Sequence, residues 1–341
     1  MSAVAPLDFR PMSLVNDRIG EAGVYLDVPE RIYHQDPLPS PSLSASVANV
    51  LIEESPGHAW HRHPRLNITR SLEIEKAKKG QNMGVALHKL ILGKGRPLKV
   101  LNFDNYMSNA AKAARDKAIA EGETPLLNKE IDAAEECAET AKRRLVGTPA
   151  EPFLGAGDAE VTIAWKERNG IWCRSRIDWL PESARQGGHI TVLDLKTTEQ
   201  SAKAEEWQRT MFDYGGDVQS EFYKRGLKTV LPGVLSVRFL FVVIEQKPPY
   251  AVEVCECSGE TAEDAKESVA MAILAWGQCL SRGVNEEAWP MYGQQIQQID
   301  PPTWRKYATE MRRMRLANQM SAWQRPLDHV PVKTLEGAAN V

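Results

Sequence analysis

The spacing of hydrophobic and polar residues changes near residue 150 from a helical period to the period of strands. Upstream, Ser44 precedes a short apolar run as a helix N-cap does, and residues 74–92 carry apolar side chains at helical spacing. Residues 109–145 are rich in Ala, Lys and Glu, which predicts one or two exposed helices. Residues 1–40 are rich in Pro, Asp and Ser and predict an irregular arm.

Downstream of this change the sequence predicts three consecutive strands. Polar and apolar residues alternate over residues 160–165, and Asn169-Gly170 is typical of a two-residue hairpin turn. Residues 171–180 predict the second strand, and a polar loop with two glycines leads to a third strand at residues 190–196. We expect these strands to form a tight antiparallel meander.

The remaining elements predict a mixed α/β core. Residues 237–244 form a continuous apolar run, which is typical of a strand buried on both faces. The other expected elements are helices at residues 204–212, 217–230 and 260–280, a short strand at residues 251–255, and a basic helix after Pro301-Pro302. The predicted fold is therefore a mixed β-sheet flanked by helices, with a helical N-terminal region.

This order of elements divides the chain into three predicted segments. Residues 1–40 form the irregular arm, and residues 296–341 form a basic C-terminal helix and tail. Residues 41–295 form one folded domain, with a helical part over residues 41–150 and an α/β core over residues 151–295. A chain of 341 residues is long enough to bury a substantial core in such a domain.

Composition narrows the class of protein. Hydrophobic residues make up 43% and charged residues 26% of the chain, as in an ordinary soluble globular protein. The sequence has no apolar run of about 18 residues, and its first residues lack the basic and then apolar pattern of a secretion signal. Its five cysteines do not indicate a disulfide framework. We therefore expect a cytoplasmic protein that makes no contact with a membrane.

The net charge of −3 neither favours nor excludes a nucleic-acid partner, because contacts to phosphates are local. Basic residues do gather in three places along the sequence. They are Lys142, Arg143 and Arg144; Arg174 and Arg176; and Arg305, Lys306, Arg312, Arg313 and Arg315. Taken alone, each of these clusters is more often a solvated face than a binding site.

The candidate chemistry lies at the ends of the second and third predicted strands. Because side chains alternate along a strand, Asp194 and Lys196 share one face while Leu193 and Leu195 face the other way. Asp178 closes the preceding strand, so the meander can bring both carboxylates to one point. Two neighbouring carboxylates repel each other and favour a hard cation between them, typically Mg²⁺. Beside such an ion, Lys196 would orient a water molecule or hold a phosphate.

Two other acid-x-Lys triplets compete with Asp194 and Lys196. Asp264-Ala265-Lys266 lies at a predicted helix start, where acids interact with the helix dipole. Glu245-Gln246-Lys247 follows an apolar strand and is the stronger alternative. It lacks a strand that ends in an acid shortly upstream, which favours Asp194 but leaves Glu245 with Lys247 open.

The acid on one strand followed by Asp-x-Lys on the next resembles the core of the PD-(D/E)xK nucleases. Residues 173–180 and 192–198 resemble the RecE-type exonucleases (exonuclease VIII) of phages and prophages and their RecB-like relatives. Residues 43–60 resemble the N-terminal opening of that branch, so the resemblance covers residues 40–280. Further matching positions follow in the same order along the chain: Gly84, His88, Glu160, Gln219 and Tyr223.

The resemblance implies a role for each matching residue. The family pattern implies that the metal ligands are His88, Asp178, Asp194 and the backbone carbonyl of Leu195. It makes Lys196 the catalytic lysine. It implies that the residues supporting the site or the DNA are Glu160, Arg176, Gln219 and Tyr223. The usual Arg-Pro-Asp reads Arg176-Ile177-Asp178 here, so the proline is lost while the acid and the Arg are kept.

The function implied by the resemblance is exonuclease digestion of double-stranded DNA from its ends. The family uses Mg²⁺, with Mn²⁺ as a substitute, and cuts 5′ to 3′ to leave 3′ single strands for recombination. Its members form rings and work beside a single-strand annealing protein. The alternatives are an endonuclease or junction resolvase on the same core, and a DNA-binding module with an inactive site. The sequence contains no Walker A motif that would indicate a built-in ATP motor.

Overall fold

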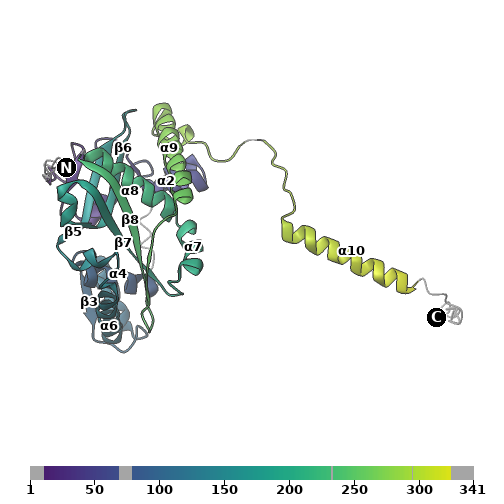
Figure 1. Ribbon diagram of the computed structural model, residues 1–341, viewed down its shortest axis with the longest axis horizontal. Helices are drawn as coiled ribbons and strands as arrows, with labels where there is room; N and C mark the ends of the chain where they lie inside the picture. The colour runs from purple at the N-terminus through teal and green to yellow at the C-terminus, as the bar shows by residue number, and fades with distance from the viewer. Residues whose placement is uncertain (1–10, 69–78, 232, 294, 324–341) are drawn as a thin grey trace. The chain divides into compact units, whose positions relative to one another are not determined.

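The computed structural model describes residues 11–68, 79–231, 233–293 and 295–323. Its central element is a seven-stranded mixed sheet in the order β1-β5-β6-β7-β8-β9, with β2 paired to β6 (Figure 1). The strands are β1 Gly23–Tyr25, β2 Leu43–Ser44, β5 Gly157–Lys166, β6 Trp172–Pro181, β7 Gly188–Thr198, β8 Val234–Glu245 and β9 Val252–Cys255. Strands β5, β6 and β7 are antiparallel neighbours, as the hairpin and loop signals predict.

Strand β8 lies parallel to β7 and is buried on both faces. Phe239, Phe241 and Val243 join one hydrophobic core, whereas Leu240 and Val242 join a second core on the other side of the sheet. This two-sided burial explains the continuous apolar run and confirms the prediction of a buried strand. The connection from β7 to β8 runs through α7 Ala204–Asp213 and α8 Gly216–Val230.

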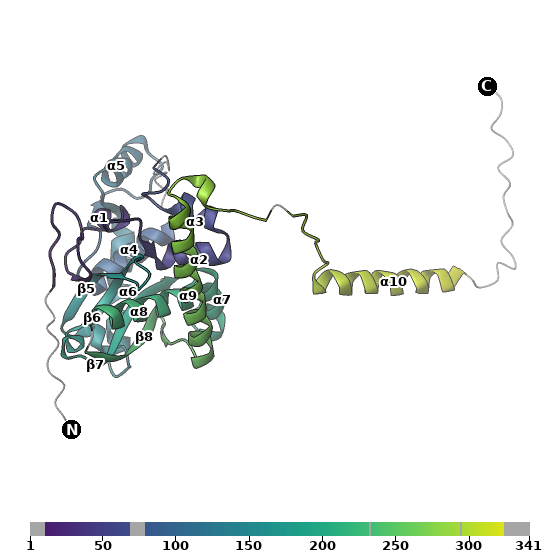
Figure 2. The same cartoon turned by 90° about the horizontal axis from the view of Figure 1, so that it is seen from above.

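Helices cover both faces of the sheet. On one face, α8 packs beside α2 Ala45–Glu53 and α9 Gly259–Arg282, and these helices lie side by side in both views (Figures 1 and 2). On the other face, the second core takes side chains from α4 Lys79–Leu92 and α6 Asn128–Leu145. This arrangement of layers confirms the predicted fold class, a mixed sheet flanked by helices.

The interpretation of residues 1–40 as an irregular arm is wrong for the part that the structure describes. Residues 11–40 contain β1 and α1 Glu30–His34, and they bury a core of their own that includes Ile19, Tyr25 and Ile32. These elements are too short to show a period in the sequence, and their burial depends on the distant strand β5, with which β1 pairs. Residues 1–10 lie outside the described part of the chain.

Buried charges fix this N-terminal segment to the sheet. Asp36 is completely buried, and its carboxylate contacts His63 Nε2 at 3.2 Å and Arg174 Nη1 at 3.1 Å. It also accepts hydrogen bonds from the backbone and the hydroxyl of Ser42. A buried charge is tolerated when it is paired and hydrogen-bonded in this way. The basic pair Arg174 and Arg176 of β6 is therefore partly structural rather than a solvated face.

The predicted helical part contains a small sheet that the sequence analysis missed. Strands β3 Leu98–Leu101 and β4 Thr124–Leu127 pair in parallel around α5 Asn109–Ala120, followed directly by α6. The chain also has α3 Pro56–Arg62 after α2. The helix expected at residues 74–92 corresponds to α4, which begins at Lys79. Its expected first residues, 74–78, lie outside the described part of the chain.

The chain divides into two compact units, and the boundary in the sequence falls between Tyr292 and Gly293. In the second unit the structure describes α10 Thr303–Trp323, the basic helix expected after Pro301-Pro302. The tail beyond Trp323 lies outside the described residues. Among the helices of the described segments, none has the length and apolar character needed to cross a bilayer.

Candidate active site

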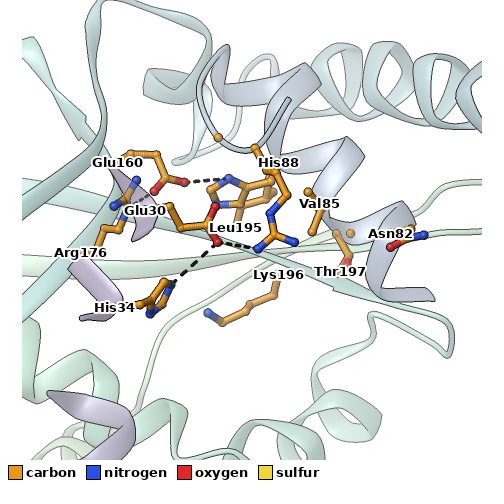
Figure 3. A pocket seen from close by; sticks show the side chains of 13 residues that line it. Glu30, His34, Asn82, Val85, His88, Glu160, Arg176, Leu195, Lys196 and Thr197 are labelled. Carbon is orange, nitrogen blue, oxygen red and sulfur yellow. Dashed lines mark hydrogen bonds and ion pairs between the residues drawn. The ribbon is translucent and has the colours of Figure 1, made fainter. Parts of the chain in front are cut away.

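A cavity of about 770 Å³ lies between α1, α4 and the inner strands β5, β6 and β7 of the sheet (Figure 3). His88 of α4 lies between two carboxylates in this region. Its Nδ1 is 3.1 Å from Glu160 Oε1, and its Nε2 is 3.2 Å from Asp178 Oδ2. The structure thus brings a helix residue and two strand acids together from positions far apart in the sequence.

Glycine at position 84 allows α4 to approach the end of β7. A Cβ atom at Gly84 would lie 2.9 Å from Thr197 Oγ1, closer than ordinary carbon contacts permit. Because Gly84 precedes His88 by one helical turn, the same close approach sets the position of the imidazole. The Gly-to-His spacing noted in the sequence therefore has a packing cause.

Glu160 has an unusual backbone conformation that accompanies its place in the site. The β5–β6 ladder pairs the residues on either side of Glu160 but not Glu160 itself, whose φ of 57° lies in the left-handed region. Non-glycine residues seldom adopt this conformation, which costs about 1 kcal/mol. The Glu160 carboxylate forms ion pairs with His88 and with Arg176 of β6. The resemblance implies only a supporting role for Glu160, and no sequence signal marks a left-handed residue within a strand.

Asp178 and Asp194 come from adjacent strands. Strands β6 and β7 pair at Trp179 and Leu193, one residue from each acid. Burial alone would raise the pKa of Asp178, but the charge and hydrogen bond of His88, together with the charge of Lys196 and the N–H of Leu195, hold the pKa below its usual value. Burial, together with repulsion from Asp178, raises the pKa of Asp194 to about 6. The repulsion expected between the two carboxylates is therefore present, and a cation placed at the pair would relieve it.

Lys196 forms a close ion pair with Asp194 on the same face of β7. Its Nζ lies 2.5 Å from Asp194 Oδ2, whereas Leu193 and Leu195 pack into the opposite core, as the strand period predicts. Although burial alone would lower the pKa of Lys196, the charges of Asp194 and Asp178 raise it above its usual value. Lys196 therefore carries a positive charge at neutral pH.

Helix α8 supplies a polar support to Asp194. Gln219 Nε2 donates a hydrogen bond of 2.7 Å to Asp194 Oδ1. Tyr223, one turn further along α8, is buried beside Gln219, and burial raises the pKa of its hydroxyl well above the usual value. Tyr223 is thus a neutral residue that packs behind Gln219. This arrangement fits the supporting role that the sequence analysis expected for both residues.

The residues present fit a divalent metal ion. Among the residues that the structure describes, one group of three side chains brings its ligand atoms within 4.8 Å of one another: His88, Glu160 and Asp178. Carboxylate oxygens and one imidazole nitrogen suit Mg²⁺ or Mn²⁺. Asp194 Oδ2 is buried, and Lys196 Nζ lies 2.5 Å from it. Since Asp194 lies on the strand next to that of Asp178, its carboxylate could contribute a further oxygen.

Two expected features are arranged differently from the sequence analysis. The backbone N–H of Leu195 donates a hydrogen bond of 2.8 Å to Asp178 Oδ2, so this residue orients an acid, and the role of its carbonyl as a ligand stays a prediction. The rival Glu245 accepts a hydrogen bond from Ala202 N before α7 and is not part of the group of candidate ligands. The structure thus assembles its candidate site around Asp178, Asp194 and Lys196.

Several residues at the site carry no signal in the sequence. Glu30 and His34 of α1 line the cavity, and the Glu30 carboxylate contacts Arg96 Nη2 at 2.9 Å and His34 Nε2 at 3.9 Å (Figure 3). The ring of Tyr214, at the end of α7, lies 5.3 Å from Lys196 Nζ. None of these residues belongs to a recognisable motif, and α1 was interpreted as part of an irregular arm.

Comparison with known proteins identifies the family. The model of a PDDEXK-like domain of unknown function (DUF3799) matches residues 76–302, which is more than half of the chain. The chain therefore belongs to this family of PDDEXK-like domains, and the resemblance to the PD-(D/E)xK nucleases is confirmed. No curated protein matches the chain by sequence.

Two solved structures are remotely similar to the chain. One, from Eubacterium rectale and described as a candidate exonuclease, is 12% identical with a TM-score of 0.48, and the match covers 81% of this chain and 94% of that one. The other, a phage related exonuclease from Haemophilus somnus 129PT, is 17% identical with a TM-score of 0.25, and covers 58% and 94%. The family match, and not these remote similarities, establishes the family.

Proposed function

We propose that the protein is a divalent-metal-dependent deoxyribonuclease that digests duplex DNA from its ends. The observation that carries this proposal is the close ion pair between Lys196 and Asp194, beside Asp178 and the group formed with His88 and Glu160. A charged lysine next to clustered carboxylates suits hydrolysis of a phosphodiester, whose charge increases in the transition state. Mg²⁺ is the proposed ion, with Mn²⁺ as a substitute.

The bound ion would supply a water molecule of lowered pKa and would counter charge on the phosphate. The chain's own residues have separate tasks. The carboxylates of Asp178 and Asp194, with His88 and Glu160, would hold the ion, and Gln219 fixes the orientation of Asp194. The Lys196 ammonium, held by Asp194, would donate hydrogen bonds to a phosphoryl oxygen or to the attacking water.

The deciding experiment incubates matched linear and circular duplex DNA with the protein and Mg²⁺. Loss of the linear form alone supports exonuclease activity. Nicking or linearisation of the circle would assign an endonuclease or resolvase, and binding without any cleavage would assign an inactive DNA-binding module. Asp194→Asn should abolish the loss of DNA, because it weakens the proposed metal site and removes the charge that holds Lys196.

A matched control separates Asp194 from the rival acid. Glu245→Gln preserves the acceptor for Ala202 N and should leave cleavage unchanged. Cleavage that survives Asp194→Asn but is lost in Glu245→Gln would move the site to Glu245 and Lys247. Thermal unfolding of both variants would verify that each is folded.

We further propose cleavage in the 5′ to 3′ direction, a ring-shaped homo-oligomer, and cooperation with a single-strand annealing protein in recombination. The support is the resemblance of residues 173–180 and 192–198 to RecE-type exonucleases. Duplexes labelled at one 5′ or one 3′ end would decide the polarity, since a 5′ label is released first by a 5′ to 3′ enzyme. Analytical ultracentrifugation would measure the oligomeric state, and a sedimentation coefficient of a monomer would contradict the ring.

A further inference from the structure

We propose that α10 binds single-stranded nucleic acid and holds the strand that digestion leaves behind. The proposal rests on the proposed deoxyribonuclease function. The helix is 21 residues long and follows directly after residue 302, where the match to the family domain ends. It is therefore an addition to the PDDEXK-like domain rather than part of its fold.

Charge is distributed unevenly between α10 and the rest of the chain. The helix carries five basic residues and one acidic residue, a net charge of +4. The remaining residues contain 37 basic and 44 acidic side chains, a net charge of −7, which together with α10 give the −3 of the whole chain. A protein with this balance repels a polyanion except where the basic residues concentrate. The charge of α10 therefore complements a phosphate backbone.

Large apolar side chains occupy a second part of the α10 surface. Trp304 and Tyr307 expose 68% and 65% of their surface, and Met311 and Met314 expose 48% and 53%. Their spacing of three, four and three residues places all four on one face of the helix. An isolated helix gains little stability from leaving such a stripe in water. A binding partner that covers these four side chains is therefore expected to have apolar surface of its own.

A single strand of nucleic acid provides both chemistries at once. Its bases have free π-faces that stack on exposed aromatic rings, while its phosphates pair with cations. In the sequence of α10, basic residues directly follow the apolar ones: Arg305 after Trp304, and Arg312 after Met311. Duplex DNA would pair only with the basic residues, since the faces of its bases are stacked inside the helix. An apolar protein groove would cover the apolar side chains but would leave the five basic residues without a role.

The consequence for the enzyme would be retention of its substrate. As one strand is digested, the complementary strand becomes single-stranded, and a helix tethered through Gly293–Pro302 would hold it at a high effective concentration. The expected effect is on dissociation between successive cuts, with no effect on the rate of each cut. The binding measurement below needs no cleavage, so it also stands apart from the proposed function.

The test uses the full chain with a fluorescent deoxythymidine homopolymer, in EDTA so that nothing is cut. Arg312→Gln with Arg313→Gln should weaken binding and reduce the dependence of log K on log salt by about 1.4, at about 0.7 for each lost phosphate contact. Trp304→Ala should weaken binding about tenfold at an unchanged salt slope, because stacking is uncharged, and Trp304→Phe should restore most of the affinity. Lys142→Gln with Arg143→Gln is the matched control, because these two neighbouring basic residues lie on α6 and not on α10.

The outcomes are separable. Equal salt slopes for the Arg312/Arg313 variant and the α6 control would overturn the proposal, as would duplex DNA binding that is equally sensitive to Trp304→Ala. If the α10 variants keep the homopolymer affinity of the parent but lose binding to another protein, α10 would instead be assigned to a protein groove, and the proposal would be overturned. If the parent binds the homopolymer through α10 but cuts no DNA with Mg²⁺, the nuclease function fails while this inference survives.

Discussion

The ammonium of Lys196 lies over the ring of Tyr214, 5.3 Å from its centroid. Such a cation–π contact is worth about 0.5–2 kcal/mol, depending on exposure. Tyr214→Leu should therefore lower single-turnover cleavage about two- to thirtyfold, because Lys196 loses one of the groups that hold it, while DNA affinity stays constant. Tyr214→Phe keeps the ring and should retain the rate. A fall in DNA affinity without a fall in rate would show that Tyr214 contacts the substrate instead.

Lys196 itself is expected to act on the transition state. Lys196→Ala should bind metal and DNA as the parent does but cut about a hundredfold slower or worse, as when other preorganised donors are removed. Lys196→Arg keeps the charge with a different shape and should recover only part of the rate. DNA affinity and single-turnover cleavage are to be measured separately. A loss of affinity in proportion to the loss of rate would make Lys196 a phosphate anchor.

Metal binding at His88 should release a proton. Burial alone would lower the pKa of His88, but the carboxylates of Asp178 and Glu160 raise it to about 10. The ring is therefore charged at neutral pH in the metal-free protein, and it must lose its proton to become a ligand. Apparent Mn²⁺ affinity should then rise with pH between about 7 and 10, and calorimetry in two buffers should detect the released proton. His88→Ala should bind Mn²⁺ more weakly and release no such proton, whereas the control His189→Gln should behave as the parent does. Identical Mn²⁺ titrations of His88→Ala and the parent would show that His88 is a packing residue.

The buried pair of His63 and Asp36 makes the fold sensitive to acid. His63 Nε2 lies 3.1 Å from Ser42 O, and His63 Nδ1 accepts a hydrogen bond from Arg65 N. A second proton on the ring would bind at Nδ1 and would face the N–H of Arg65. Burial lowers the pKa of His63 below its usual value. Folding therefore excludes this proton, and the free energy of unfolding should decrease as the pH falls below about 6.5, by at most about 1.4 kcal/mol for each pH unit.

Asp36 adds to the same trend at lower pH. Burial alone would raise its pKa, but Arg174 and His63 hold the pKa below its usual value, so its stabilising charge is lost only in stronger acid. Urea unfolding between pH 8 and pH 5, followed by tryptophan fluorescence, measures the first step. His63→Gln should flatten the pH dependence, while the exposed His61, changed to Gln, should leave it intact. Parallel curves for the parent and His63→Gln would contradict the assignment.

Local patterns in the sequence were sufficient to predict the strands that carry the candidate site. The hairpin at Asn169-Gly170, the alternation along β7 and the apolar run of β8 depend on neighbouring residues, and the structure has all three. The break between the helices expected at residues 204–212 and 217–230 also occurs, where Gly215 has a φ of 74° and separates α7 from α8. These features are local, so each can be inferred from a short segment.

Long-range features of the site could not be predicted in this way. Asp36 can be buried because it forms an ion pair with Arg174, which is distant in the sequence. No local pattern predicts this pair. Glu160 joins the candidate metal ligands through a left-handed backbone within a strand, which favours glycine on local grounds. Tyr214 contacts Lys196 from the end of α7, across a separation in the sequence that no local pattern bridges. Tertiary contacts decide each of these cases.

The order of strands in the sheet bears on how the protein is synthesised. Strand β7 is held in place by β8, which follows it only after α7 and α8, and Gln219 lies on α8. A ribosome-bound chain that stops before Val234 contains every acid of the candidate site but lacks the partner strand that fixes Asp194 and Lys196. Parallel pairs of this kind form late, because both strands and their connection must be present. The nascent chain is therefore expected to remain inert toward nucleic acid until translation has passed Glu245.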